Sequence, residues 1–313
     1  MNPTILLIGR SGQIGSELKQ LLPEIGNVVA PGRDALDLSV PSQIRSAIAE
    51  VRPQAIVSAA AYTAVDQAES DAATARAVNA EAPRVLAEEA KRLGALLVHY
   101  STDYVFDGEK RSPYAEDDVT HPLSVYGATK LAGEMAIRES GAAHLILRTS
   151  WVYAPRGRNF LRTVIRLATQ REELRIVRDQ TGAPTWSREV AAATTGLLRQ
   201  LLDSPDASWA VVRGTYHMTA GGETNWAEFA EAILAEAAAL PREDAWLTVA
   251  TNGKPQMARE VIGITTAEYP TPARRPAYSV LSNARLASTF GLSLPDWREQ
   301  LRSAFARRNE PSE

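Results

Sequence analysis

The chain has 313 residues, of which 45% are hydrophobic and 23% charged, so it can bury a substantial core in one large or two smaller domains. Its 34 lysines and arginines against 37 aspartates and glutamates give a net charge of −3, which provides no overall basic field to recruit nucleic acid or an anionic membrane. The absence of cysteine excludes disulfides, thiolate catalysis and cysteine-bound metals. The N-terminus lacks the pattern of a signal peptide, and no run of about 18 apolar residues follows, so we expect a cytoplasmic protein.

The N-terminal segment predicts the strand, turn and helix of a dinucleotide fold. TILLIG at 4–9 is typical of a buried parallel strand, and a glycine-rich turn leads from it into the helix-forming SELKQLL at 16–22. Glycine permits a tight turn and lets a pyrophosphate approach the free amides at the start of the helix. The spacing G-x-x-G-x-x-G is weak evidence alone, but after a strand it predicts a cofactor contact by Gly9, Gly12, Gln13, Ile14 and Gly15.

The short second strand predicted in NVVAPGR at 27–33 ends where the choice between cofactors is usually made. An acidic side chain there would bind the adenosine ribose hydroxyls, whereas an arginine accommodates a 2′-phosphate. Gly32 and Arg33 therefore favour NADPH, with NADH still usable, and Asp37 and Leu38 follow closely. The alternative is that Arg33 is a solvated charge in a loop.

A proline-bounded helix at 41–53 and a buried strand in QAIVSAA at 54–60 come next. The small Ala59 and Ala60 after that strand would let the dinucleotide pass, although an alanine run also suits tight packing. The segment 70–93 predicts a supporting helix that Pro83 kinks or restarts.

The stretch 94–130 has the features of an active site. Gly94–Tyr100 is an apolar run of strand length, so Thr102 lies at the end of a strand, where open α/β sheets form their ligand crevice. A helix over YGATKLAGEMAIRES then places Tyr126 and Lys130 one turn apart on one face. A nearby ammonium would lower the tyrosine pKa from about 10 and let Tyr126 act as a general acid. Such a pair also arises by chance, and it gains weight only from the glycine turn.

After another apolar strand in HLILRTSWVYAP at 144–155, the alternation of strand and helix loosens. Helices are predicted near 158–170, 186–202 and 225–240. The fold class is therefore α/β, with a Rossmann-type doubly wound parallel sheet and a smaller, mixed α/β substrate-binding lobe. We expect a dinucleotide-binding domain at 1–155, to which a segment near 186–215 returns, and a mainly substrate-binding lobe at 156–313.

Together these features resemble the extended short-chain dehydrogenase/reductase family. Four longer stretches are similar to the members that reduce nucleotide-linked 4-keto sugars, and the similarity spans nearly the whole chain: AAAYTAVDQAE at 59–69, HYSTDYVFDG at 99–108, RTSWVYAP at 148–155 and DQTGAPT at 179–185. The resemblance implies that NADPH reduces the C4 keto group of dTDP-4-dehydro-L-rhamnose. The alternatives are another nucleotide-linked 4-keto sugar or a non-catalytic nucleotide-binding regulatory subunit, and keeping a proton donor with its partners argues against the latter.

The resemblance also implies roles for single residues. Tyr126 would donate a proton, Lys130 would orient the cofactor ribose, and Thr102 would hydrogen-bond the C4 oxygen. The sugar would be contacted by Thr102, Asp103, Tyr104 and Trp151, although a buried tryptophan is more often part of a core. Besides the glycine turn, the cofactor would be contacted by Arg33, Asp37, Leu38, Ala61, Tyr62, Thr63, Tyr126 and Lys130.

Three further features stay outside the predicted site. Asn79 resembles a helix asparagine of the family's proton path, but a lone asparagine is more often structural. Arg274 and Arg275, among prolines, could meet a nucleotide-sugar pyrophosphate or form an exposed pair. Some family members are metal-linked dimers. Glu17 could match one ligand, but Arg188 stands where another would align, which leaves both a metal and a homodimer open.

Overall fold

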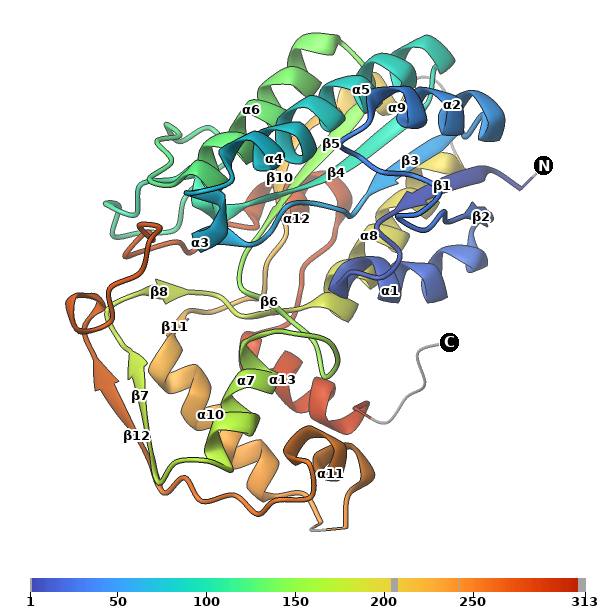
Figure 1. The fold of residues 1–313 in the computed structure, drawn as a ribbon. Coiled ribbons are helices and arrows are strands. Elements are labelled where there is room, and N and C mark those ends of the chain that lie inside the picture. Colours follow the sequence, from blue (N-terminus) through green and yellow to red (C-terminus); the bar gives the residue numbers. More distant parts are fainter. Residues whose placement is uncertain (1, 204–207, 242, 309–313) are drawn as a thin grey trace.

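The computed structural model describes residues 2–203, 208–241 and 243–308 (Figure 1). Its larger part is a six-stranded sheet in the order β10-β5-β4-β3-β1-β2, in which every pair of neighbours is parallel. From β1 the chain adds β2 on one side, and from β3 it adds β4, β5 and β10 on the other, so the strand order reverses between β1 and β3. In such a doubly wound sheet, the ligand crevice lies at this point, beyond the carboxyl ends of the strands. The predicted fold class is confirmed. The strands are β1 (Thr4–Ile8), β2 (Asn27–Val29), β3 (Ala55–Ser58), β4 (Leu96–Thr102), β5 (His144–Thr149) and β10 (Gly214–His217).

Helices cover both faces of this sheet, because successive apolar side chains of its central strands point to opposite faces. Ile5 and Leu7 of β1 face one layer, and Leu6 and Ile8 face the other. The first layer contains α1 (Gln13–Leu21), α8 (Ser187–Leu202), α9 (Ser208–Val212) and α12 (Ala284–Phe290). The second contains α2 (Pro41–Val51), α5 (Ala82–Leu93) and α6 (Val125–Ser140).

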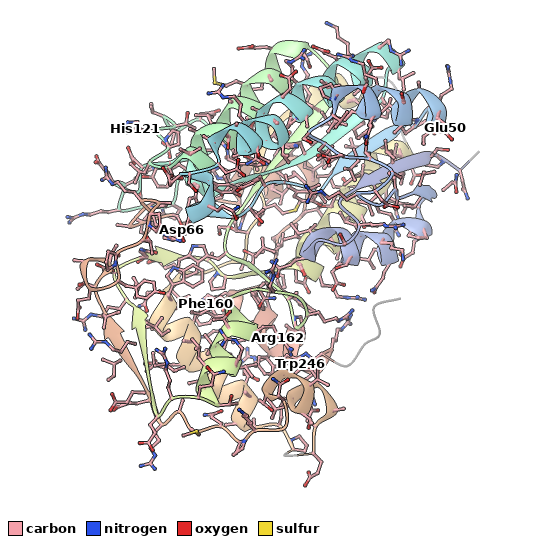
Figure 2. All side chains as sticks on the ribbon, viewed as in Figure 1. Glu50, Asp66, His121, Phe160, Arg162 and Trp246 are labelled. Carbon is pink, nitrogen blue, oxygen red and sulfur yellow. The ribbon has the colours of Figure 1, made fainter. Side chains whose placement is uncertain are left out.

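A second hydrophobic core lies in the smaller lobe at the bottom of Figure 1. There the Arg162 guanidinium lies 5.5 Å from the centroid of the Trp246 ring (Figure 2). The lobe is built from α7 (Phe160–Ala168), α10 (Trp226–Ala238), α11 (Ala245–Thr251), α13 (Trp297–Ala306) and the parallel pair β7 (Glu173–Val177) and β12 (Glu260–Ile264). The domain boundaries stay a prediction, which the two cores support; α8 and β10 pack in the first of them.

Further short elements complete the fold. Two small sheets pair β6 (Val152–Tyr153) with β9 (Thr185–Trp186) and β8 (Thr181–Gly182) with β11 (Thr224–Asn225). The remaining turns of helix are α3 (Val65–Ala68), η1 (Leu22–Glu24), η3 (Asp103–Val105) and η4 (Thr266–Glu268). Within the described ranges, we find no helix long and apolar enough to cross a membrane.

The helix predicted over 70–93 is interrupted, as Pro83 suggested. A π-helical segment, Ala77–Glu81, joins α4 (Ala72–Arg76) to α5, and Pro83 lies in the first turn of α5. Proline lacks an N–H group and its ring crowds the carbonyl four residues earlier, which breaks regular α-helical bonding there. The carbonyl of Asn79 comes so close to α6 that a Cβ atom at Gly133 would lie 2.2 Å from it.

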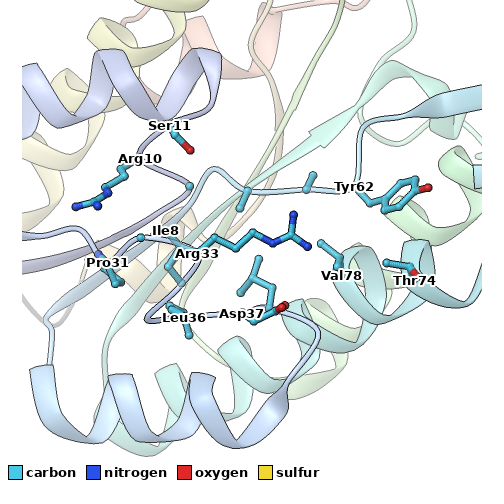
Figure 3. A pocket seen from close by; sticks show the side chains of 15 residues that line it. Ile8, Arg10, Ser11, Pro31, Arg33, Leu36, Asp37, Tyr62, Thr74 and Val78 are labelled. Carbon is cyan, nitrogen blue, oxygen red and sulfur yellow. The ribbon is translucent and has the colours of Figure 1, made fainter. Parts of the chain in front are cut away.

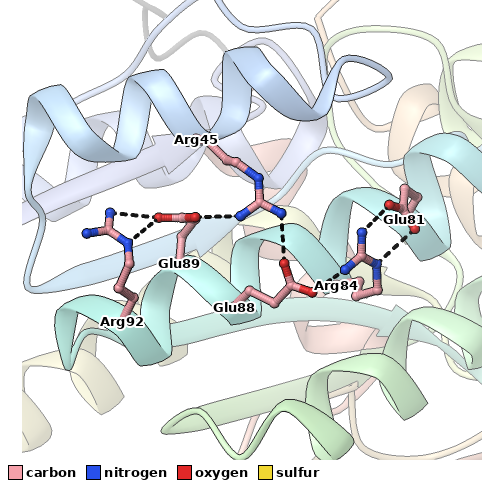
Figure 4. Close-up of polar contacts among 6 residues, drawn as sticks. All are labelled: Arg45, Glu81, Arg84, Glu88, Glu89 and Arg92. Atoms are coloured by element: carbon pink, nitrogen blue, oxygen red, sulfur yellow. Dashed lines mark hydrogen bonds and ion pairs between the residues drawn. The ribbon is translucent and has the colours of Figure 1, made fainter.

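An ion-pair ladder joins α2 to α5 on the surface (Figure 4). The Arg45 guanidinium lies 2.8 Å from Glu88 and 2.6 Å from Glu89, and Arg84 and Arg92 extend the ladder along α5. The arginine side chains are 41–54% exposed, so each pair contributes at most about 1 kcal/mol.

Candidate active site

Two cavities of about 880 and 260 Å³ lie beyond the strand ends and share Gly9, Ser11, Ala60 and Ala61 in their walls, so they are two ends of one groove. Among the predicted site residues, the larger end is lined by Gly9, Gly12, Gln13, Ile14, Ala61, Thr63, Thr102, Asp103, Tyr104, Tyr126, Lys130 and Trp151. The smaller end is lined by Gly9, Arg33, Asp37, Leu38, Ala61 and Tyr62. Gly15 lines neither end.

The glycine turn fits a dinucleotide pyrophosphate. Gly9 has φ +93°, and a Cβ atom there would lie 2.7 Å from the backbone nitrogen of Ala60. At Gly15, a Cβ atom would lie 2.0 Å from the Gly9 carbonyl oxygen, so Gly15 allows close packing of helix on turn. No side chain caps α1 at Gly12, so amides at the start of the helix keep no side-chain acceptor, as the binding of an anionic group there requires.

At the smaller end, the Arg33 side chain lies across the pocket toward Tyr62 (Figure 3). Among the described residues, no acceptor takes a hydrogen bond from this exposed guanidinium. The Asp37 carboxylate accepts hydrogen bonds from the Ser39 hydroxyl and amide at 2.7 and 2.8 Å, which lower its pKa. Arg10, which was not among the predicted site residues, also lines the pocket and donates to the Ala30 carbonyl at 2.9 Å. Its place inside the glycine turn could have revealed it.

Asn79, which we left outside the predicted site, fixes part of the groove wall. Its side-chain oxygen accepts from the Tyr62 amide at 2.8 Å, and its amide group donates to the Tyr62 carbonyl at 3.0 Å. The same group donates to the Thr129 hydroxyl on α6 at 3.2 Å. Asn79 therefore ties the segment beside the cofactor pocket to the helix that carries Tyr126 and Lys130.

The predicted hydroxyl groups meet at the end of β4. The Thr102 hydroxyl donates to the Asp103 carboxylate at 3.0 Å and accepts from the Tyr104 amide at 3.1 Å, and it lines the same cavity as Tyr126. The Tyr104 ring packs edge-on against Tyr126, with centroids 5.6 Å apart. Burial raises the pKa of Tyr126 to about 12, against the lowering effect of Thr102, and burial raises the pKa of Asp103 to about 6.

Lys130 lies at the same site but is held by β4. Its ammonium group donates to the Tyr100 carbonyl at 2.6 Å and lies 3.1 Å from His99 Nε2. Burial lowers its pKa to about 8. Our expectation that Lys130 lowers the pKa of Tyr126 is not met in this structure, because the loss of water around the phenol outweighs the other influences on it.

A buried ion pair behind Lys130 was missed by the sequence analysis. Glu134, one turn after Lys130, accepts from Arg148 at 2.7 and 2.9 Å and from the Ser101 hydroxyl at 2.6 Å. Burial opposes the charge of Glu134, but Arg148 keeps its pKa below the usual value. The pair fixes α6 to β4 and β5. The spacing of Glu134 from Lys130 on one helix is visible in the sequence. Its partner Arg148 lies on β5, and the sequence did not show that the two would meet.

Trp151 lines the larger end, but another ring covers one of its faces. Its indole stacks on Trp226 with centroids 3.5 Å apart and an interplanar angle of 5°. Gly182 also lies against it, since a Cβ atom there would lie 2.4 Å from the Trp151 ring. Trp226 donates to the Gln180 side chain at 3.2 Å, which ties the stack to the DQTGAPT loop. No local pattern in the sequence pointed to Trp226, and the sugar contact of Trp151 stays a prediction.

Arg275, Glu17 and Arg188 are paired, whereas Arg274 is exposed. Arg275 forms an ion pair with Asp66 at 2.8 Å and is 21% exposed, so it is neither unpaired nor part of an exposed arginine pair. Glu17 accepts from Arg188 at 3.0 Å, which supplies positive charge beside the candidate metal ligand. Across the described parts of the chain, no group of three or more His, Cys, Asp or Glu residues is placed to hold a metal.

A doubly wound sheet with a glycine turn and a Thr, Tyr and Lys site at the end of β4 is the arrangement of a dinucleotide-dependent oxidoreductase. The sequence profile described as the RmlD substrate binding domain matches residues 2–309. The chain belongs to this family.

Comparisons with individual proteins agree. The chain is 50% identical over 294 residues to a dTDP-4-dehydrorhamnose reductase of Burkholderia thailandensis, covering 94% of this chain and 95% of the relative. It is 43% identical over 298 residues to the Escherichia coli K12 protein of that name, covering 94% of each. A crystal structure of dTDP-4-dehydrorhamnose reductase from Bacillus anthracis in complex with NADP superposes with a TM-score of 0.85 at 34% identity, covering 98% of this chain and 100% of that one.

Proposed function

We propose that this protein uses NADPH to reduce the C4 keto group of dTDP-4-dehydro-L-rhamnose, giving dTDP-L-rhamnose. The observation that carries the proposal is the meeting of Thr102, Tyr126 and Lys130 in one cavity that continues into the glycine turn. The relatives named dTDP-4-dehydrorhamnose reductase, and the one crystallised with NADP, support both the substrate and the cofactor.

The side chains of Tyr126 and Thr102 are suited to donating a proton and a hydrogen bond to a carbonyl oxygen. NADPH, when bound, supplies the hydride that adds to C4. Tyr126 transfers its phenolic proton to the C4 oxygen, breaking its own O–H bond as the sugar O–H bond forms. With a pKa of about 12, Tyr126 is protonated at neutral pH, as a donor must be. The Thr102 hydroxyl would turn its single O–H from Asp103 to the same oxygen, where negative charge develops.

Residues at the two ends of the groove would bind different parts of the cofactor and the sugar. Lys130, with a pKa of about 8, is mostly charged at neutral pH and would hold the cofactor ribose beside Tyr126. At the smaller end, Arg33 would contact the 2′-phosphate of NADPH, with Arg10 as a second cation on that wall. Trp151 would face the apolar side of the deoxysugar. A cytoplasmic location and the absence of nucleic-acid and membrane partners remain part of the proposal, which leaves a homodimer open.

The proposal is tested by turnover of purified protein with NADPH and a panel of nucleotide-linked 4-keto sugars that differ in base and sugar. The expected result is the highest kcat/KM with dTDP-4-dehydro-L-rhamnose and formation of dTDP-L-rhamnose, identified by NMR. A clear preference for another sugar would show that the protein is a reductase of a different 4-keto sugar. NADPH binding without turnover of any sugar would favour the regulatory subunit.

A further inference from the structure

Lys130 reaches a strand that supplies two acceptors for it. The amine of this buried side chain, 2% exposed, has Tyr100 O at 2.6 Å and His99 Nε2 at 3.1 Å. A lysine ammonium has three N–H groups and no acceptor, so the His99 nitrogen must be the unprotonated, accepting one. Burial, and then the charge of Lys130, lower the pKa of His99 well below its usual value, which agrees with a neutral imidazole.

The tautomer that Lys130 requires leaves His99 with an unsatisfied donor. A neutral imidazole that accepts at Nε2 carries its proton on Nδ1. Nδ1 is buried and has no hydrogen-bond partner among the described residues. A buried donor without an acceptor costs about 1–3 kcal/mol, and an apolar side chain of similar shape would avoid that cost. Stability alone therefore does not account for a histidine at this position.

We infer that His99 is a positioning residue for the reaction, which holds the Lys130 ammonium group in one orientation. With two N–H groups held by β4, the direction of the third is set by tetrahedral geometry. Lys130 lines the larger cavity with Tyr126, so the third N–H is available to the cofactor ribose. This inference rests on the proposed function, in which Lys130 holds that ribose.

Two substitutions separate positioning from packing. His99→Phe keeps a flat ring but removes the acceptor, and we expect kcat to fall on the order of 10- to 100-fold while KM for the 4-keto sugar stays unchanged, because misplaced catalytic groups cost rate. His99→Gln offers an amide oxygen as acceptor and should recover most of the lost kcat. Both variants are compared with the wild-type enzyme, whose own turnover tests the proposed function separately.

His144→Phe is the matched control. His144 lies on the neighbouring strand, is 6% exposed and bonds through Nδ1 to the Ala142 carbonyl at 2.8 Å, and it does not line the groove. Its substitution should leave kcat within about twofold of the wild type, with any effect confined to thermal stability. Equal kcat in His99→Phe and wild type, an equal loss in His144→Phe, or no recovery in His99→Gln would overturn the inference.

A measurement on the wild-type protein does not depend on whether the His99 variants fold. The sequence has 4 histidines, so ¹⁵N labelling of histidine gives a simple spectrum, in which substitution of each of the other three leaves the His99 signal assigned. The expected signal for His99 is a neutral ring protonated on Nδ1, with an unprotonated Nε2. A ring protonated on Nε2, or charged at neutral pH, would contradict the inference, because Nε2 could not then accept from Lys130.

Discussion

The two ends of the groove hold their charges in different ways. At the larger, buried end, Lys130 and the Glu134–Arg148 pair behind it are at most 2% exposed, and each of these side chains is hydrogen-bonded to protein. At the smaller, open end, Arg33 and Arg10 are exposed to solvent. Water screens charges at the open end, whereas buried groups interact strongly and lose much when a partner is removed. We therefore expect substitutions at the buried end to affect rate or folding, and those at the open end to adjust cofactor choice.

The largest effect is expected from Tyr126→Phe at the buried end. Removing the phenolic proton should lower kcat by about 100-fold or more, since a general acid contributes roughly that much, while NADPH affinity is retained. Steady-state kinetics and cofactor titration measure the two quantities. A reduction rate near that of the wild type would show that Tyr126 is not the proton donor.

Next in size is Glu134→Gln, which leaves the Arg148 charge buried without its partner. Loss of one member of a buried pair costs about 3–5 kcal/mol, and urea denaturation should show this loss in the free energy of unfolding. The matched control is Glu81→Gln, which removes the carboxylate that pairs with Arg84 in the surface ladder. That carboxylate is 43% exposed, and the expected loss is below about 1 kcal/mol. Similar losses in both variants would erase the contrast between buried and exposed pairs.

The sequence predicted the parts of this site that depend on local pattern. The end of β4 at Thr102 and the helix carrying Tyr126 and Lys130 follow from apolar runs, helix formers and spacing within a few residues. Partners that meet only after folding were not predictable. Arg148 lies on a different element from Glu134, and Trp226 reaches Trp151 from the other lobe.

The pKa of Tyr126 was misjudged for a related reason. Its spacing from Lys130 is visible in the sequence, but the loss of water around the phenol is a property of the whole fold. The same holds for Arg275, whose partner Asp66 is far away along the chain. Spacing on one helix predicts proximity, whereas burial decides which charge state is favoured.

A pH profile tests the charge of Lys130. Burial lowers its pKa from 10.5 to about 8, so the ammonium is present below that pH and is lost as the pH rises through it. We expect kcat/KM for NADPH, which reports the free enzyme, to fall above pH about 8. Lys130→Met should be slow throughout and lack this limb, and an unchanged limb in that variant would assign it to another group.

The smallest effect is expected at the open end, from Arg33→Ala. Loss of a solvent-screened contact to the 2′-phosphate should raise KM for NADPH by about tenfold, or ~1.4 kcal/mol, and leave KM for NADH nearly unchanged. Arg10→Ala, measured in parallel, shows how much the second cation contributes. Equal effects of Arg33→Ala on both cofactors would mean that Arg33 acts through folding or adenine packing.

The most direct test of NADPH-dependent reduction at C4 of the sugar follows the hydride itself. NADPH carrying deuterium on the reactive face of nicotinamide C4 is incubated with the wild-type protein and dTDP-4-dehydro-L-rhamnose, and the product is examined by NMR and mass spectrometry. The expected product is dTDP-L-rhamnose with a single deuterium at C4 of the sugar. Product without deuterium, deuterium at another carbon, or no product while NADPH remains bound would contradict NADPH-dependent reduction at C4.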